Sequence, residues 1–127
     1  FFRFWFRFVF RNMDLIELGR YEQLCEIVAR DFDSFSGFAL ERYFYWKFVE
    51  DSSYTRMGAW WNRKGEEEID LVCEDELAGT IDFYEIKRDI SRYNSSVLES
   101  KTAAFFKKHP QKDHLKVTRG VLSLTDM

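Results

Sequence analysis

Residues 80–89, TIDFYEIKRD, have the composition and the alternation of a β-strand. Glu85 and Lys87 are two positions apart, so on a strand their side chains project from one face. Opposite charges at neighbouring positions of one face indicate either an ion pair at a sheet edge or a functional site. The strand that precedes this one in the sequence bears on the choice.

A second strand is predicted over residues 67–75, EEIDLVCED, with a turn near Leu77–Ala78 joining it to the first. In an antiparallel pair about this turn, residues whose numbers sum to 155 face one another, Asp70 and Glu85 among them. Two facing carboxylates destabilise a bare sheet, and Lys87 supplies only one positive charge. The pair is therefore predicted to hold a divalent cation, Mg²⁺ or Mn²⁺, through carboxylate oxygens.

Glu41 is a third candidate acid, because it lies within an apolar helical stripe in residues 37–48, GFALERYFYWKF. The apolar residues at helical spacings from it are Phe38, Phe44, Tyr45 and Phe48. A carboxylate in such a position needs a partner. Either it joins the two strand carboxylates, or it forms a cap or a salt bridge with an arginine such as Arg42 or Arg63.

The other elements are predicted from periodicity and from helix-breaking residues. Helices are expected over residues 19–35, 36–51 and 92–109, the last stopped by Pro110, and further strands over residues 55–65 and 114–126. Residues 1–12, FFRFWFRFVFRN, alternate as a strand does, yet the arginines at a spacing of four also form one helical stripe. Pattern alone leaves both structures open for this segment.

The net charge of −3 conceals an asymmetry along the chain. Residues 51–85 sum to −7, whereas residues 86–120 sum to +6. The basic block favours a nucleic-acid partner or is a solvated helix face. The residues expected to contact a nucleic-acid backbone are Arg88, Arg92, Lys101, Lys107 and Lys108. Lys101 has an alternative role, since it shares a helix face with Val97, Leu98 and Phe105 and can simply extend past them to solvent.

Composition limits the class of protein. A chain of 127 residues with 46% hydrophobic and 19% aromatic residues is expected to form a folded, soluble domain. Cys25 and Cys73 match no disulfide or metal spacing, which favours a reducing, cytoplasmic location. The apolar start of the chain is too short and too often interrupted by arginine to cross a membrane. It is expected to pack on an upstream portion of a longer protein or on a second copy of the chain.

The order of these features resembles that of a known family. A helix acid, an Asp on a strand and Glu-x-Lys on the next strand resemble the PD-(D/E)xK nuclease superfamily. More narrowly, the chain resembles the C-terminal domain of unknown function attached to archaeal and bacterial AAA-type ATPases. The segments that carry this resemblance are FWFRFVFRN, GAWWNRKGEEEIDLV, YEIKRD and LSLTDM. The chain departs from the superfamily at Ile69, where Pro is usual, and at Ile86 and Arg88, which flank Lys87 where Cys and Trp are frequent.

The resemblance implies a fold, a site and a function. It implies an α/β, restriction-endonuclease-like three-layer core, with a mixed sheet of about four strands flanked by helices. Residues 1–30 would be a helical lead-in from a missing winged-helix and ATPase portion, and residues 31–127 the nuclease-like domain. Asp70 and Glu85 would bind the metal, with Lys87 and Glu41 as catalytic residues.

Two functions are therefore expected. The first is Mg²⁺-dependent phosphodiester hydrolysis or nucleic-acid binding by a domain that serves an ATPase. The second is a catalytically inactive module that docks a partner for the ATPase. The sequence contains no glycine-rich phosphate loop, so nucleotide hydrolysis is not expected within it.

Overall fold

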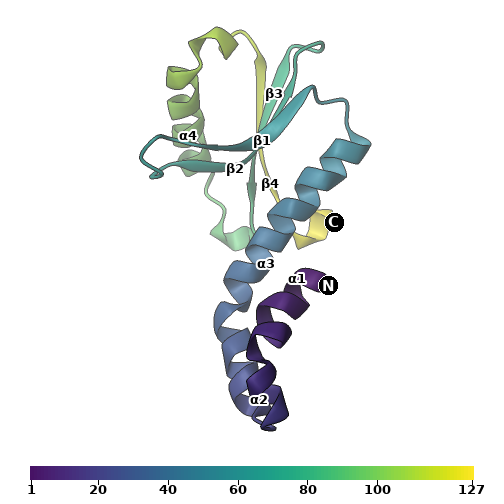
Figure 1. Ribbon diagram of the computed structural model, residues 1–127. Coiled ribbons are helices and arrows are strands. Elements are labelled where there is room, and N and C mark those ends of the chain that lie inside the picture. The colour runs from purple at the N-terminus through teal and green to yellow at the C-terminus, as the bar shows by residue number, and fades with distance from the viewer. The chain divides into compact units, whose positions relative to one another are not determined.

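In the computed structural model, which describes residues 1–127, the chain divides into an N-terminal unit, Phe1–Phe38, and a C-terminal unit, Ala39–Met127. The division lies inside one long helix, and the boundary at residue 30 that the family resemblance implies stays a prediction. The main helices and strands are α1 (Phe2–Phe4), α2 (Met13–Glu17), α3 (Tyr21–Asp51), β1 (Arg56–Trp61), β2 (Glu68–Asp75), β3 (Thr80–Ile86), α4 (Ser95–Lys108) and β4 (Lys116–Leu122) (Figure 1). None of the helices combines the length and the apolar character that a membrane-spanning segment requires.

The N-terminal unit is entirely helical apart from one tight turn. Between α1 and α2 the chain continues through a π-helical turn, Trp5–Val9, and a 3₁₀ turn, Phe10–Asn12, so the helical alternative for this segment is confirmed. Gly19 has a φ of +67°, a conformation that glycine adopts without strain, and it reverses the chain into α3. Phe8 is buried and its ring lies against those of Phe4 and Phe35.

Helix α3 corrects one prediction. The two helices expected over residues 19–35 and 36–51 form a single element. Ser36 does not cap a new helix, because its hydroxyl donates to the backbone oxygen of Asp33 at 3.2 Å. Gly37 lowers helix propensity but does not remove a backbone donor as proline would.

The C-terminal unit contains a four-stranded mixed sheet in the order β1-β2-β3-β4. The first three strands are antiparallel, and β4 is parallel to β3 because α4 forms the crossover between them. The β2–β3 turn contains Gly79, whose φ is +72°, while the Asp75 side chain accepts hydrogen bonds from the Leu77 and Ala78 backbones. The predicted strands and the helix before Pro110 are thus present, with shifts at their ends.

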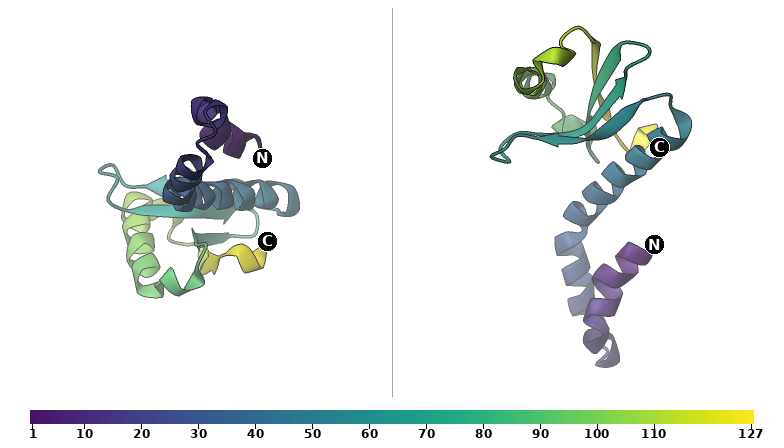
Figure 2. Two further views of the ribbon diagram at one scale, coloured as in Figure 1. Left: turned by 90° about the horizontal axis from the view of Figure 1, so that it is seen from below. Right: turned by 45° about the horizontal axis from the view of Figure 1, so that its top comes forward.

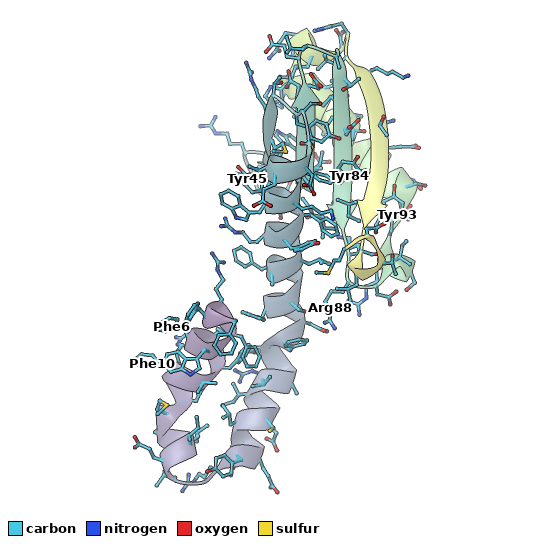
Figure 3. All side chains as sticks on the ribbon, turned by 90° about the vertical axis from the view of Figure 1, so that its right-hand side faces the viewer. Phe6, Phe10, Tyr45, Tyr84, Arg88 and Tyr93 are labelled. Carbon is cyan, nitrogen blue, oxygen red and sulfur yellow. The ribbon has the colours of Figure 1, made fainter.

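The sheet is covered on both faces, so the predicted three-layer α/β arrangement is confirmed (Figure 2). The cluster on the α4 side contains Ile69, Ile81, Phe83, Leu98, Phe105 and Leu115. The cluster on the side of α3 residues 39–51 contains Leu40, Phe44, Leu71, Cys73 and Ile86. Tyr84 lies on this second face, with its ring centroid 5.6 Å from that of Phe48 (Figure 3).

Candidate functional site

The register of β2 and β3 brings two acids together. Leu71 pairs with Tyr84 and Val72 with Phe83, so the predicted register, in which paired numbers sum to 155, is confirmed. Asp70 lies one position beyond these pairs, and its Oδ2 accepts a hydrogen bond of 2.7 Å from the Ile86 backbone N–H. The Asp70 carboxylate is therefore held against the end of β3, next to Glu85.

A β-bulge shapes this end of β2. Gly58 pairs with Val72 and Trp60 with Ile69, so a single β1 residue, Ala59, spans Asp70 and Leu71. The side-chain alternation changes there: Ile69 belongs to the α4-side cluster and Leu71 to the α3-side cluster, although they are two residues apart. Bulges re-aim side chains and are frequent next to active sites. Asp70 lies within this irregularity.

Two lysines meet the two acids. Lys87 Nζ lies 2.8 Å from Glu85 Oε2 and 3.8 Å from Asp70 Oδ2. Lys101, from α4, places its Nζ 2.5 Å from Glu85 Oε1. The Glu85 side chain is only 5% exposed, so both of its oxygens are used in ion pairs away from bulk water. Asp70, Glu85, Lys87 and Lys101 are called the carboxylate cluster below.

Burial and charge act in opposite directions on the two acids. Burial raises the pKa of Asp70, and the neighbouring Glu85 charge adds to this effect, while the hydrogen bond from Ile86 opposes it. Burial also disfavours the charged form of Glu85, but the hydrogen bonds from Lys101 and Lys87 outweigh it and lower the pKa of Glu85. The cluster therefore holds one acid favoured in the ionised form beside one that resists ionisation.

The lysine of the Glu-x-Lys pair remains charged in this setting. Burial opposes the charged form of Lys87, but the hydrogen bond to Glu85 and the charge of Asp70 raise its pKa overall. Its side chain is 33% exposed, more than either acid. Lys87 is thus a cation at the rim of the carboxylate cluster, with access to solvent.

Glu41 lies within the electrostatic field of the same cluster. Burial raises the pKa of Glu41, and the next largest cause is the charge of Asp70. No salt bridge joins Glu41 to Arg42 or Arg63, and the Arg42 guanidinium lies instead over the Trp46 ring at 5.7 Å. The salt-bridge alternative for Glu41 is therefore not present. Its position is that of a half-buried acid close to the two strand carboxylates.

Asp70 and Glu85 offer the type of ligand that a hard cation prefers, but they are only two side chains. Carboxylate oxygens are the ligands that Mg²⁺ prefers, and Mg²⁺ commonly takes few protein ligands and keeps several waters. However, no group of three or more His, Cys, Asp or Glu side chains is arranged to hold a metal. A cation at Asp70 and Glu85 would have to be completed by water or by a movement of Glu41.

One of the basic residues predicted for nucleic-acid binding, Lys101, differs from the others in its contacts. Arg88, Arg92, Lys107 and Lys108 are exposed, the last two in the final turn of α4. Lys101 is separate from them, because its ammonium is engaged by Glu85. Sequence reasoning missed this ion pair and also the one between Lys112 and the buried Glu74. Neither pair follows from spacing, since both depend on how the chain returns across the sheet.

Comparison with known proteins then identifies the family. The family model DUF234, described as archaeal and bacterial proteins of unknown function, matches residues 5–96. The chain belongs to this family. The DUF234 match includes Glu41, Asp70, Glu85 and Lys87, and it ends in the first turn of α4, before Lys101. No curated protein and no solved structure matches the chain.

Proposed function

We propose that the C-terminal unit is a nuclease-like domain of the PD-(D/E)xK type, which binds a divalent cation at Asp70 and Glu85 and hydrolyses a phosphodiester. The observation that carries this proposal is the convergence of Asp70, Glu85 and Lys87 at the end of the β2–β3 pair. The three-layer α/β arrangement around that pair supports it.

Each residue of the cluster has a role that follows from its surroundings. Asp70 and Glu85 would supply oxygens to Mg²⁺ or Mn²⁺, which when bound would provide Lewis-acid activation of water and of the phosphate. Lys87, charged and partly exposed, is placed to stabilise negative charge on a phosphate bound beside the two acids. Glu41, whose pKa is raised by burial, is suited to hold a proton close to the site.

The partners follow from the rest of the surface. Exposed Arg92, Lys107 and Lys108, together with Arg88, would contact a nucleic-acid backbone without reading its sequence. Phe6 and Phe10 of the N-terminal unit are also exposed (Figure 3). These rings support docking onto an upstream ATPase portion or a second copy of the chain, in the cytoplasm.

Calorimetric titration with Mn²⁺ tests the proposal. The wild type should take up the ion at or below millimolar concentration, and Asp70→Asn should not, because it removes one of two ligands. Asp82→Asn is a matched control: Asp82 lies on β3 but is hydrogen-bonded to Tyr54 in the α3-side layer, so its substitution should leave uptake unchanged. Absence of uptake by the wild type would contradict the proposal.

A second function, an inactive docking module, is favoured by one specific observation. Both oxygens of Glu85 are already paired with lysines, so the cluster is electrically balanced without a metal. If these four charged side chains only stabilise the fold, the wild type, Asp70→Asn and Asp82→Asn would all fail to take up Mn²⁺. The exposed aromatic rings of the N-terminal unit would then be the functional surface.

A further inference from the structure

The Lys101 ammonium occupies the oxygen of Glu85 that faces α4. Lys101 Nζ is 2.5 Å from Glu85 Oε1, and Lys87 Nζ is 2.8 Å from Oε2 of the same carboxylate. Both ammonium groups oppose a divalent cation at Glu85, because each repels its charge and each takes one of the lone-pair positions of the carboxylate. The structure therefore raises the question of which lysine is displaced.

Lys87 is the more firmly placed of the two. It lies near both acids, 3.8 Å from Asp70 as well as 2.8 Å from Glu85, and its backbone N–H donates to the Leu122 oxygen of β4 at 2.9 Å. Lys101 has a single ion-pair partner and is attached to α4, on the layer above the sheet. Its four-carbon chain can swing without moving the strands.

Helix α4 itself need not move when Lys101 does. Leu98 and Thr102 are fully buried and Phe105 is nearly so. Thr102 Oγ1 also accepts a hydrogen bond of 2.8 Å from Arg119 Nε of β4 and donates to the Glu99 backbone oxygen. These contacts hold α4 on the sheet on either side of Lys101, so release of its ammonium is a side-chain rotation and not a helix displacement.

We infer that Lys101 is a built-in competitor for the metal: its ammonium fills the site at Glu85 until a divalent cation replaces it. This inference rests on the proposed metal site. Displacement turns the Lys101 ammonium away from Glu85 and leaves it at the edge of the cluster, where a phosphodiester bound to the metal would meet it. Metal uptake thus frees a second ammonium, besides that of Lys87 in the Glu-x-Lys pair, to contact the substrate.

A second buried pair provides the matched control. Glu74 is 8% exposed and accepts a hydrogen bond from Lys112, on the same α4-side layer but at the other end of the β2–β3 pair. No second acid lies in an ion pair with Lys112. Lys101→Met and Lys112→Met each remove one ammonium from a buried glutamate and keep the apolar chain. Only the first should affect metal binding.

Calorimetric Mn²⁺ titration of the wild type and both variants tests the inference. Lys101→Met should bind Mn²⁺ on the order of tenfold more tightly than the wild type, the amount expected from removing a competing charge-assisted hydrogen bond. Lys112→Met should match the wild type. Lys101→Arg, which retains the charge, should not show the gain. If Lys101→Met folds poorly, Lys101→Gln replaces it, with the same expected direction.

The outcomes separate this inference from the proposed function. Equal or weaker binding by Lys101→Met, with normal uptake by the wild type, would overturn the competition and leave the metal site intact. No uptake by either protein would overturn both. A tighter Lys112→Met would also contradict the inference, since loss of any buried ammonium would then suffice.

A measurement on the wild type gives an independent readout. Mass spectrometry after brief acylation of lysines should show Lys101 protected without metal and more reactive when Mn²⁺ is present, because the released amine reaches solvent. The reactivity of Lys112 should not change. Unchanged protection of Lys101 at a saturating Mn²⁺ concentration would show that the cation binds without displacing it.

Discussion

Glu85 and Glu74 are both buried, both face the α4 layer, and both accept a hydrogen bond from a lysine that lies outside the sheet. They differ in their neighbours. Glu74 has one partner, Lys112, whereas Glu85 has two lysines and lies beside a second acid, Asp70. In the Glu74–Lys112 pair, the two opposite charges simply neutralise each other. The Glu85 end instead brings four charged side chains together, so a cation bound at one of them acts on the charges of the others.

The apolar centre of the β2–β3 pair separates these two ends. Val72 and Phe83 pair directly between them, and Phe83 is completely buried in the α4-side cluster. Charges at one end are therefore not in contact with those at the other. The same pair of strands carries a structural ion pair at one end and a candidate reactive cluster at the other.

The largest expected effect comes from Glu85→Gln. The variant should lose about 3 kcal/mol of unfolding free energy, because the two lysines lie at different oxygens of Glu85 and the NH₂ group that replaces one oxygen would face an ammonium. Glu74→Gln should lose only about 1 kcal/mol, since its amide oxygen can still accept from Lys112. Urea denaturation of both variants at pH 7 measures the difference. Equal losses would show that the second lysine at Glu85 adds nothing.

A smaller effect, of opposite sign, is expected from Asp70→Asn. The pKa of Asp70 is raised above 3.8 by burial, so its ionisation at neutral pH opposes folding. Without metal, the variant should melt a few degrees above the wild type at pH 7. This gain should vanish as the pH falls below the ordinary pKa of 3.8, where Asp70 is protonated in the folded and unfolded states alike.

The pH dependence of Glu85 has the reverse sign and is the control for Asp70. Its pKa is lowered by the lysines, so the stability it contributes is fully present above 4.5 and is lost as the pH falls through the lowered value. Thermal melts of the three proteins between pH 3 and pH 7 should therefore show opposite trends. As the pH rises, the melting temperature of Asp70→Asn should increase relative to that of the wild type, and that of Glu85→Gln should decrease. A lower melting temperature for Asp70→Asn at pH 7 would show that its proximity to Lys87 outweighs its burial.

The smallest expected effect is the coupling free energy between substitutions at Glu74 and at Glu85, which lie at the two ends of the β2–β3 pair. If Val72 and Phe83 isolate them, the losses of Glu74→Gln and Glu85→Gln should add to within about 0.5 kcal/mol in the double variant. Urea denaturation of the four proteins completes this cycle. A coupling well above that limit would mean that α4 and the turn after it, which carry Lys101 and Lys112, transmit a change from one end to the other.

The local sequence pattern was sufficient to predict the β2–β3 hairpin, and with it the proximity of Asp70 and Glu85. A side-chain period of two and a short turn leave few registers, and a slip of one residue would expose the buried face. The same locality explains why α4 was predicted with a stop at Pro110. It also explains the error at Ser36 and Gly37: both residues are compatible with a helix start, but nothing local forces one.

Only tertiary packing decided which cations reach the two buried glutamates. Lys101 is 16 residues from Glu85 and Lys112 is 38 residues from Glu74, so no periodicity connects them. They meet because α4 crosses the sheet to place β4 parallel to β3, which fixes α4 and the residues after it over the ends of the β2–β3 pair. The bulge at Asp70 likewise arises from pairing with β1. Sequence patterns encode neighbours along one element, whereas these contacts depend on the relative placement of several elements, which is set by the packing of the whole α4-side layer.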